Sequence, residues 1–159
     1  MITEGDSGIG RSVAILMARE GADISFVYLP EEEEDAQATK KEIEKAGRKA
    51  HLIPLDTTSR ENCQKAVEEH MKTFGKLSIL VNNSAMQVMC EDLKDIDLDV
   101  TEKTFQTKIL SMFAMCKYAL SHIKRGSSIV NSCSIAGYAG SPTLVDYSST
   151  KRAIATSTR

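Results

Sequence analysis

The sequence predicts an α/β fold, with an open, mostly parallel sheet that is wound in both directions and covered by helices on both faces. The first supporting observation is that apolar, β-favouring segments alternate with segments of helical periodicity along all 159 residues. The second is the near-continuous apolar run 77–85, which is typical of a central strand in a parallel sheet. The third is a glycine-rich stretch, 3–10, that leads directly into the first helix.

The composition is that of an ordinary globular domain. Hydrophobic residues make up 42% of the chain and its net charge is −2, so nothing favours a nucleic acid or a membrane as a partner. The four cysteines and three histidines show no metal-ligand spacing, so we expect reduced thiols and no metal site. Because nothing resembles a secretory leader, we expect a cytoplasmic protein with a single domain, residues 1–159.

Local signals divide the first half of the chain into strands and helices. Only Met1 and Ile2 precede the glycine-rich stretch, so we expect a truncated first strand. Pro30 precedes the acidic run 31–35, and carboxylates complement the dipole at a helix start, so this run indicates a helix N-terminus rather than a binding patch. Gly47 is expected to end that helix. The expected strands are 23–29 and 50–56, and the expected helices are 11–20, 31–46 and 59–74.

The second half of the chain continues the alternation after the fourth strand, 77–85. Apolar residues at helical spacing from 99 to 122 predict one long helix that is buried on more than one side. The apolar run 129–133 predicts a buried fifth strand. In a sheet with the strand order 3-2-1-4-5, this strand would lie at an exposed edge. A last helix is expected from 146 to 159.

A tyrosine and a lysine lie four residues apart in the last predicted helix, at Tyr147 and Lys151. Residues at this spacing share a helix face, so the ammonium can lie beside the phenol and favour its ionised form, which suits acid/base chemistry at a carbonyl or alcohol. Ser134 lies thirteen residues before Tyr147, after the fifth strand, where its hydroxyl can reach the same substrate oxygen. Taken alone, such a pair is more often a solvated aromatic residue beside a charge.

Together with the glycine-rich stretch, these residues make the chain resemble the short-chain dehydrogenase/reductase family. That family combines a TGxxxGxG near its start with a serine and a YxxxK at this spacing. Within the family, segments 28–36 and 141–147 resemble those of plant glucose and ribitol dehydrogenase homologues and related bacterial proteins. The alternation of strands and helices predicts about five strands in the order 3-2-1-4-5. The resemblance implies that this sheet is a Rossmann-like, doubly wound one, in a chain truncated at both ends.

The resemblance also implies a function for this single, truncated NAD(P)-binding domain. The reaction would be reversible hydride transfer between NAD(P) and a small alcohol or carbonyl compound, such as a sugar or polyol. Tyr147 would transfer the proton, Lys151 would favour the tyrosinate and bind the nicotinamide ribose, and Ser134 would hold the substrate oxygen. The residues expected to bind the cofactor are Thr3, Gly5, Ser7, Gly8, Ile9, Gly10, Arg11, Asp56, Asn82 and Lys151.

The cofactor is expected to be NADP or NAD, with a preference for NADP. An acid at the end of the second strand would bind the ribose hydroxyl, whereas a basic residue would accept a 2′-phosphate. Tyr28 and Leu29 offer neither, which leaves Arg11 as the nearest candidate for the phosphate. Asp56 stands where the family places an acid near the adenine, but its position is equally consistent with a cap for the next helix. We expect a homo-oligomer, because the helix around Lys108 forms the dimer interface in the family.

Three sites depart from the family pattern. Glu4 stands at the first glycine position, where it adds a side chain and a negative charge near phosphates. Lys108 replaces an asparagine that supports a water next to the catalytic lysine. After Asn82 and Asn83, Ser84-Ala85 replaces the Ala-Gly of the family's NNAG. The alternative reading is therefore an impaired or inactive remnant that keeps only its fold or its self-association.

Overall fold

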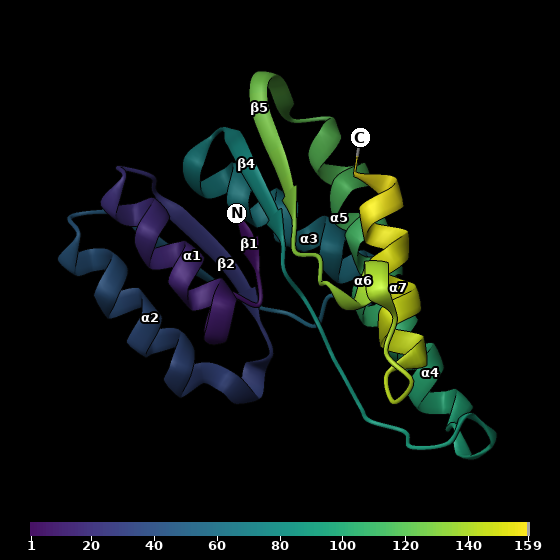
Figure 1. Ribbon diagram of the computed structural model, residues 1–159. Coiled ribbons are helices and arrows are strands. Elements are labelled where there is room, and N and C mark those ends of the chain that lie inside the picture. The colour runs from purple at the N-terminus through teal and green to yellow at the C-terminus, as the bar shows by residue number, and fades with distance from the viewer. Residues whose placement is uncertain (159) are drawn as a thin grey trace.

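The computed structural model describes residues 1–158 and contains a five-stranded parallel sheet between two layers of helices (Figure 1). The strand order is β3-β2-β1-β4-β5, which confirms the order expected from the sequence. Because the winding direction reverses between β1 and β4, the region beyond the carboxyl ends of these strands is where such sheets leave room for a site. The strands are β1 Ile2–Thr3, β2 Ile24–Tyr28, β3 Ala50–Pro54, β4 Leu77–Asn82 and β5 Ile123–Asn131.

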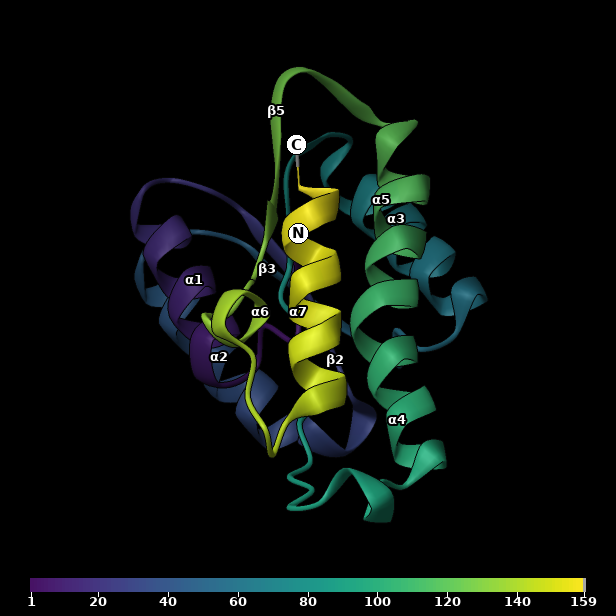
Figure 2. The same ribbon diagram turned by 45° about the vertical axis from the view of Figure 1, so that its right-hand side comes forward.

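The helices separate into two layers, with α1 and α2 on one side of the sheet and α3, α4, α5 and α7 on the other (Figures 1 and 2). The longer helices are α1 Gly8–Arg19, α2 Glu33–Lys45, α3 Arg60–Phe74, α4 Leu98–Phe105, α5 Ser111–Leu120 and α7 Val145–Ser157. The short segments are η1 Pro30–Glu32, η2 Leu93–Asp95, the π-helical η3 Gln106–Leu110 and α6 Ala136–Ala139. None of the described helices is long and apolar enough to span a membrane.

Successive residues of β2 face two different cores, as the period of a strand requires. Phe26 packs with Ile2 on the side of α1 and α2, whereas Val27 packs with Ile53 on the side of α3 and α5. Although β1 has only two residues, Ile2 is completely buried and pairs with Phe26 on one side and Val81 on the other. The short first strand therefore still fixes the position of the glycine-rich loop that follows it.

The signals expected at helix ends are confirmed for α2. Its first turn contains the acidic residues 33–35, and Gly47 follows its end with a φ of +73°. The cap of α3 is Ser59, whose hydroxyl accepts a hydrogen bond from the backbone N–H of Asn62 at 3.3 Å. Asp56 therefore does not cap α3, and that alternative is excluded.

The expected fifth strand is wrong in its start and in its burial. β5 begins at Ile123 rather than at residue 129, because Ile123 already pairs with Leu77 of β4, and the register shifts before pairing resumes at Ser128. The expected position at an exposed edge is correct, and for that reason the strand is not buried: Val130 is 45% exposed.

The expected helix from 99 to 122 is also interrupted. It consists of α4, the π-helical η3 and α5, and it ends at Leu120. A π-helical turn adds a residue to the turn and rotates the side chains that follow. The last helix begins at Val145 and ends at Ser157, one residue earlier than expected among the described residues, because Thr158 has an extended backbone. The last residue of the expected helix, Arg159, lies outside the described residues.

Candidate active site

The carboxyl ends of the strands surround a cavity of about 290 Å³. Its walls come from the ends of β2, β3 and β4, from the glycine-rich loop and from the helix α4. The residues that line it include Glu4, Glu31, Glu32, Asp56, Ser84 and Ala85. Of the residues expected to bind a cofactor, only Asp56 lines this cavity.

Thr3 joins the glycine-rich loop to the end of β4. Its hydroxyl oxygen accepts hydrogen bonds from the backbone N–H groups of Asn83 at 2.9 Å and Ser84 at 3.0 Å. The loop itself is close-packed, because a Cβ on Gly5 would lie 2.4 Å from Cβ of Phe26. A Cβ on Gly10 would lie 1.7 Å from the backbone oxygen of Glu4. Glycine is therefore required at both positions for packing.

The start of α1 presents backbone donors towards solvent. Ser7 is the N-cap but its side chain makes no capping hydrogen bond, so it leaves the N–H groups of the first turn to other acceptors. Gly8 has a φ of +51°, and a Cβ there would meet nothing within 4 Å. Ser7, Gly8 and Ile9 are exposed. This arrangement suits an anion at the helix N-terminus.

Glu4 is the only non-glycine residue with a positive φ in the described chain, with a value of +50°. Its carboxylate accepts a hydrogen bond from the backbone N–H of Ala85 at 3.0 Å, and its backbone oxygen accepts one from the side chain of Asn83 at 3.2 Å. Burial raises the pKa of Glu4 to about 7, and the charges of Asp6 and Glu32 add to the rise. The family's glycine position thus holds a half-buried carboxyl group that bridges the loop and β4.

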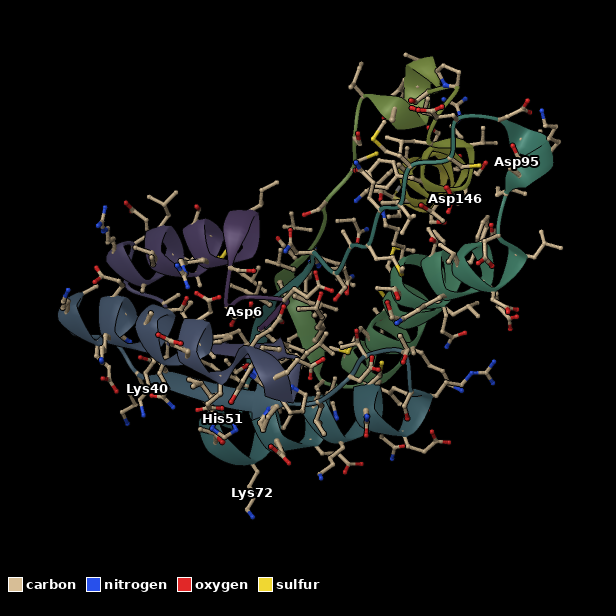
Figure 3. All side chains as sticks on the ribbon, turned by 90° about the horizontal axis from the view of Figure 1, so that it is seen from below. Asp6, Lys40, His51, Lys72, Asp95 and Asp146 are labelled. Atoms are coloured by element: carbon tan, nitrogen blue, oxygen red, sulfur yellow. The ribbon has the colours of Figure 1, made fainter. Side chains whose placement is uncertain are left out.

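Arg11 faces α2 rather than the cavity. Its guanidinium donates to the backbone oxygen of Asp6 at 2.7 Å and to the hydroxyl of Thr39 at 2.8 Å, and it pairs with the carboxylate of Asp35 at 2.6 Å. The expectation that Arg11 is free to receive a phosphate is therefore not met in this conformation. Asp6 lies in the middle of the molecule and is 1% exposed, and its carboxylate oxygens make no hydrogen bond to the described residues (Figure 3).

The two remaining cofactor candidates lie in different places. Asp56 is exposed at the rim of the cavity, where its carboxylate accepts the backbone N–H of Thr58 at 2.8 Å. Asn82 is buried and does not line the cavity. Its side-chain amide instead donates to Asn131 of β5 at 2.8 Å and to the sulfur of Cys116. Asn82 therefore joins β4 to β5.

Its neighbour Asn83 is the residue that reaches the glycine-rich loop, and sequence reasoning did not single it out. Besides its contacts with Thr3 and Glu4, its side-chain oxygen accepts a hydrogen bond from the hydroxyl of Ser132 at 2.9 Å. The alternation of side chains along a strand was the available signal, since Asn82 and Asn83 must face opposite sides of the sheet.

Tyr147 and Lys151 lie on α7, where Lys151 is buried and Tyr147 is partly exposed. The ammonium nitrogen of Lys151 lies 5.8 Å from the centre of the Tyr147 ring and donates to the backbone oxygen of Ser132 at 2.5 Å. Lys151 is 2% exposed, and this burial lowers its pKa. Ser134 follows β5, where its hydroxyl accepts the backbone N–H of Ala136 at 3.2 Å. No hydrogen bond joins Ser134 to Tyr147 in residues 1–158.

The segment from the end of β5 to α6 lies beside α7 (Figure 2) and is packed closely against it. The thiol of Cys133 donates to the backbone oxygen of Lys151 at 3.3 Å. A Cβ on Gly137 of α6 would lie 2.7 Å from the backbone carbon of Lys151, so only glycine fits there. The serine-bearing turn and the helix that carries Tyr147 are therefore positioned by backbone contacts.

Lys108 occupies one face of the Tyr147 ring. Its amine nitrogen lies 3.4 Å from the ring centre, is buried, and has no hydrogen-bond partner among residues 1–158. Burial lowers the pKa of Lys108 to about 7, and the charge of Lys151 contributes, whereas Asp146 and Glu4 oppose the shift. Asp146, in the first turn of α7, lines a small hollow together with residues of the segment before η2 and of α4. Sequence reasoning expected a second ammonium here, but not its contact with the ring.

The comparisons with known proteins agree with this geometry. The family profile described as short chain dehydrogenase matches residues 1–159. Over its whole length the chain is 50% identical to the uncharacterized oxidoreductase YhdF of Bacillus subtilis and 42% identical to NADPH-dependent aldehyde reductase 1, chloroplastic, of Arabidopsis thaliana. It is 40% identical to glucose and ribitol dehydrogenase homolog 2 of Arabidopsis thaliana. The chain covers 55%, 57% and 56% of these proteins, so it spans little more than half their length.

Solved structures show the same fold. A short chain dehydrogenase from Burkholderia cenocepacia in complex with NADP superposes with a TM-score of 0.91 at 30% identity, over 96% of this chain and 62% of that one. A blue fluorescent protein from a metagenomic library, in complex with NADPH, gives a TM-score of 0.86 at 29% identity, over 95% of this chain and 62% of the other.

Proposed function

The chain belongs to the short chain dehydrogenase family, and from this premise we propose that it transfers hydride between a nicotinamide dinucleotide and a small alcohol or carbonyl compound. The single observation that carries the proposal is the pair on α7, in which the buried ammonium of Lys151 lies 5.8 Å from the ring centre of Tyr147. We also propose that residues 1–159 act as one domain, and that its free cysteines belong to a reducing compartment such as the cytoplasm.

The backbone of the glycine-rich loop would bind the dinucleotide. Gly8 and Ile9 open the first turn of α1, where N–H groups left uncapped by Ser7 would receive the pyrophosphate. Gly5 and Gly10 allow the close packing that forms this loop, and Thr3 ties it to β4. Asp56, at the rim of the cavity, would receive the adenine. When bound, the nicotinamide supplies or accepts the hydride.

The residues of this chain would move the proton and hold the substrate. Tyr147 would donate its phenolic proton to the carbonyl oxygen during reduction and accept it from the alcohol during oxidation. Lys151 would favour the tyrosinate and contact the ribose, because an ammonium favours a nearby anion. The hydroxyl of Ser134 would hold the substrate oxygen once it exchanges its contact with Ala136.

We favour NADP over NAD, and a sugar, polyol or aldehyde as the substrate. The named NADPH-dependent relative and the neighbours solved with NADP and NADPH support this choice of cofactor. The 2′-phosphate would be received by Arg11 after release from Asp35, an ion pair that is partly exposed and therefore weak.

A thermal melt of the purified chain with increasing NADP or NAD tests the cofactor site. At about one hundred times its dissociation constant, a ligand that binds only the folded state adds about 2.7 kcal/mol of stability. We expect a cooperative melt whose midpoint rises more with NADP than with NAD. A cooperative melt that neither dinucleotide moves would contradict the proposed site.

Replacement of the tyrosine tests the chemistry. In reductase assays with aldehydes, sugars and polyols, Tyr147→Phe is expected to lower turnover by about 10²–10⁴-fold, the range that a positioned proton donor contributes. The shift of the melting midpoint by NADP should be retained, because the phenol does not hold the phosphates. Equal rates for the variant and the parent chain would exclude Tyr147 as the proton donor.

A second candidate function is self-association without turnover, and the position of Lys108 favours it. This amine covers the face of the Tyr147 ring, a place the family leaves to an uncharged side chain. Activity that appears only after Lys108→Asn and Glu4→Gly are combined would identify an impaired enzyme. A folded double variant that binds NADP but stays inactive would favour the second candidate.

A further inference from the structure

The carboxyl group of Glu4 is a titratable group that the proposed reaction does not use, although it faces the proposed cofactor cavity. Its side chain lines the cavity and accepts the backbone N–H of Ala85, so it occupies a donor at the end of β4. Its φ of +50° is a conformation that is unfavourable for a residue with a side chain, so the surrounding contacts hold it there. Those contacts are the hydrogen bonds to Ala85 and Asn83.

The charges around Glu4 are mostly negative. Asp6 from its own loop and Glu32 from η1 act on its carboxyl group, and Glu31 and Asp56 line the same cavity. The positive groups on this side are Lys103, which lines the cavity, and the buried Lys108 and Lys151, on which the charge of Glu4 acts. An anionic ligand group that approaches the loop therefore meets carboxylates first, and among those that line the cavity Glu4 is the one that accepts the backbone N–H of Ala85.

We propose that Glu4 determines which ligands the cavity accepts: its ionised carboxylate excludes ligands that place a phosphate at the glycine-rich loop, and its protonated form admits them. A nucleoside without phosphate is accepted in either state. This inference rests on the proposed function, because it concerns the dinucleotide at the same loop. The affinity for the pyrophosphate then depends on pH. A glycine at this position has no side chain that titrates and would give no such dependence.

The titration of Glu4 places this range near neutrality. Because its pKa is raised to about 7, most of the carboxyl groups are protonated at about pH 6 and most are ionised at about pH 8. If only the protonated form admits the phosphates, the apparent affinity is proportional to the protonated fraction. This fraction, and with it the affinity, falls about tenfold from about pH 6 to about pH 8.

Calorimetric titration with NAD and with adenosine tests the inference. NAD keeps the charge of its pyrophosphate over this interval, and adenosine carries none. For the parent chain we expect NAD to bind about tenfold more weakly at pH 8 than at pH 6, and adenosine to bind equally at both. Glu4→Gln keeps the size of the side chain without its charge, so it should bind NAD equally at both pH values and as tightly as the parent chain at low pH. The matched control Glu31→Gln removes another carboxylate of the cavity and should keep the pH dependence.

Three results would overturn the inference. The first is an NAD affinity of the parent chain that does not change with pH. The second is a Glu4→Gln variant whose NAD affinity still depends on pH as in the parent chain. The third is a Glu31→Gln variant whose NAD affinity no longer depends on pH. If no variant, including Glu4→Gly, binds NAD at either pH while adenosine still binds, the proposed function fails together with the inference. Binding of NAD with a flat pH profile leaves the proposed function standing and removes only the role of Glu4.

Discussion

At the scale of the residue, Lys108 shows how one substitution changes a site without changing the fold. A lysine at this position buries its amine between α7 and η3, where the ring of Tyr147 is its contact and no described residue accepts its protons. A cation over an aromatic face gains on the order of 2 kcal/mol when desolvated, which offsets only part of the cost of burying the charge. The lowered pKa of Lys108, about 7, is the result of that imbalance.

The first prediction at this scale concerns stability against pH. The ordinary pKa of a lysine is 10.5 and that of Lys108 in the folded chain is about 7, so between these values the unfolded state binds more protons than the folded state. The contribution of Lys108 to stability is therefore most favourable above pH 10.5 and is lost as pH falls towards 7. Lys108→Met removes this dependence, and its advantage in melting midpoint over the parent chain should be largest near neutral pH and shrink as pH rises.

The control is Lys103→Met on α4, because Lys103 is exposed. Its effect on the free energy of unfolding should stay within about 0.5 kcal/mol, as for surface substitutions in general. A parent chain and a Lys108→Met variant whose midpoints differ by a constant amount at all pH values would show that Lys108 does not titrate in this range.

At the scale of the element, the glycine-rich loop depends on two glycines for different reasons. Gly8 needs its left-handed conformation but has open space around it, whereas Gly10 has no room for a Cβ against the backbone oxygen of Glu4. The requirement at Gly8 comes from the local backbone conformation. The requirement at Gly10 comes from a close contact between the start of α1 and the end of β1. The sequence shows both glycines in the same motif and does not distinguish them.

Alanine at each glycine separates these two costs. Gly8→Ala is expected to cost about 1–2 kcal/mol of unfolding free energy, the cost of a left-handed residue with a side chain. Gly10→Ala is expected to cost about 3 kcal/mol or more, because the loop backbone must move to relieve the overlap. Urea denaturation measures both variants. An unfolding free energy of Gly10→Ala equal to that of Gly8→Ala would show that the loop moves at little cost.

At the scale of the whole molecule, the segment from α4 to α5 carries large apolar side chains on the surface. Leu110, Phe113 and Leu120 are 41%, 51% and 60% exposed, and α5 lies beside α7 on the outside of the molecule (Figure 2). Leu110 and Phe113 line a hollow of about 210 Å³ on this surface. We propose that a second copy of this chain covers it, since exposed apolar side chains rimmed by polar residues, here Arg60 and Lys117, mark an interaction site.

Charge introduced at this surface tests self-association. Phe113→Glu is expected to convert an oligomer into a monomer, because an ionised carboxylate is costly to bury in an apolar interface. Sedimentation equilibrium measures the mass of each variant. Leu16→Glu is the matched control, since Leu16 is 58% exposed on α1 in the opposite helix layer and should leave the mass unchanged. A parent chain that sediments as a monomer would contradict the proposal.

The sequence by itself determined the strand order and the places of most helices, because both follow from local periodicity, from helix-end residues such as Gly47, and from the winding rules of parallel sheets. It also named Tyr147, Lys151 and Ser134 as candidates, because motif spacing is local information. The expected start and burial of β5 were wrong, although its position at the edge was correct, since the burial of an edge strand depends on what covers it and not on its own residues.

Only the tertiary structure decided which side chains meet. Arg11 is engaged by Asp35, Asn83 rather than Asn82 reaches the loop, Glu4 bridges to Ala85, and Lys108 covers Tyr147. Each of these contacts joins residues from different elements, many positions apart in the chain. Their charge and protonation depend on burial, a property of the packed molecule, and for this reason the sequence could name the residues of the candidate site but not their electrostatic state.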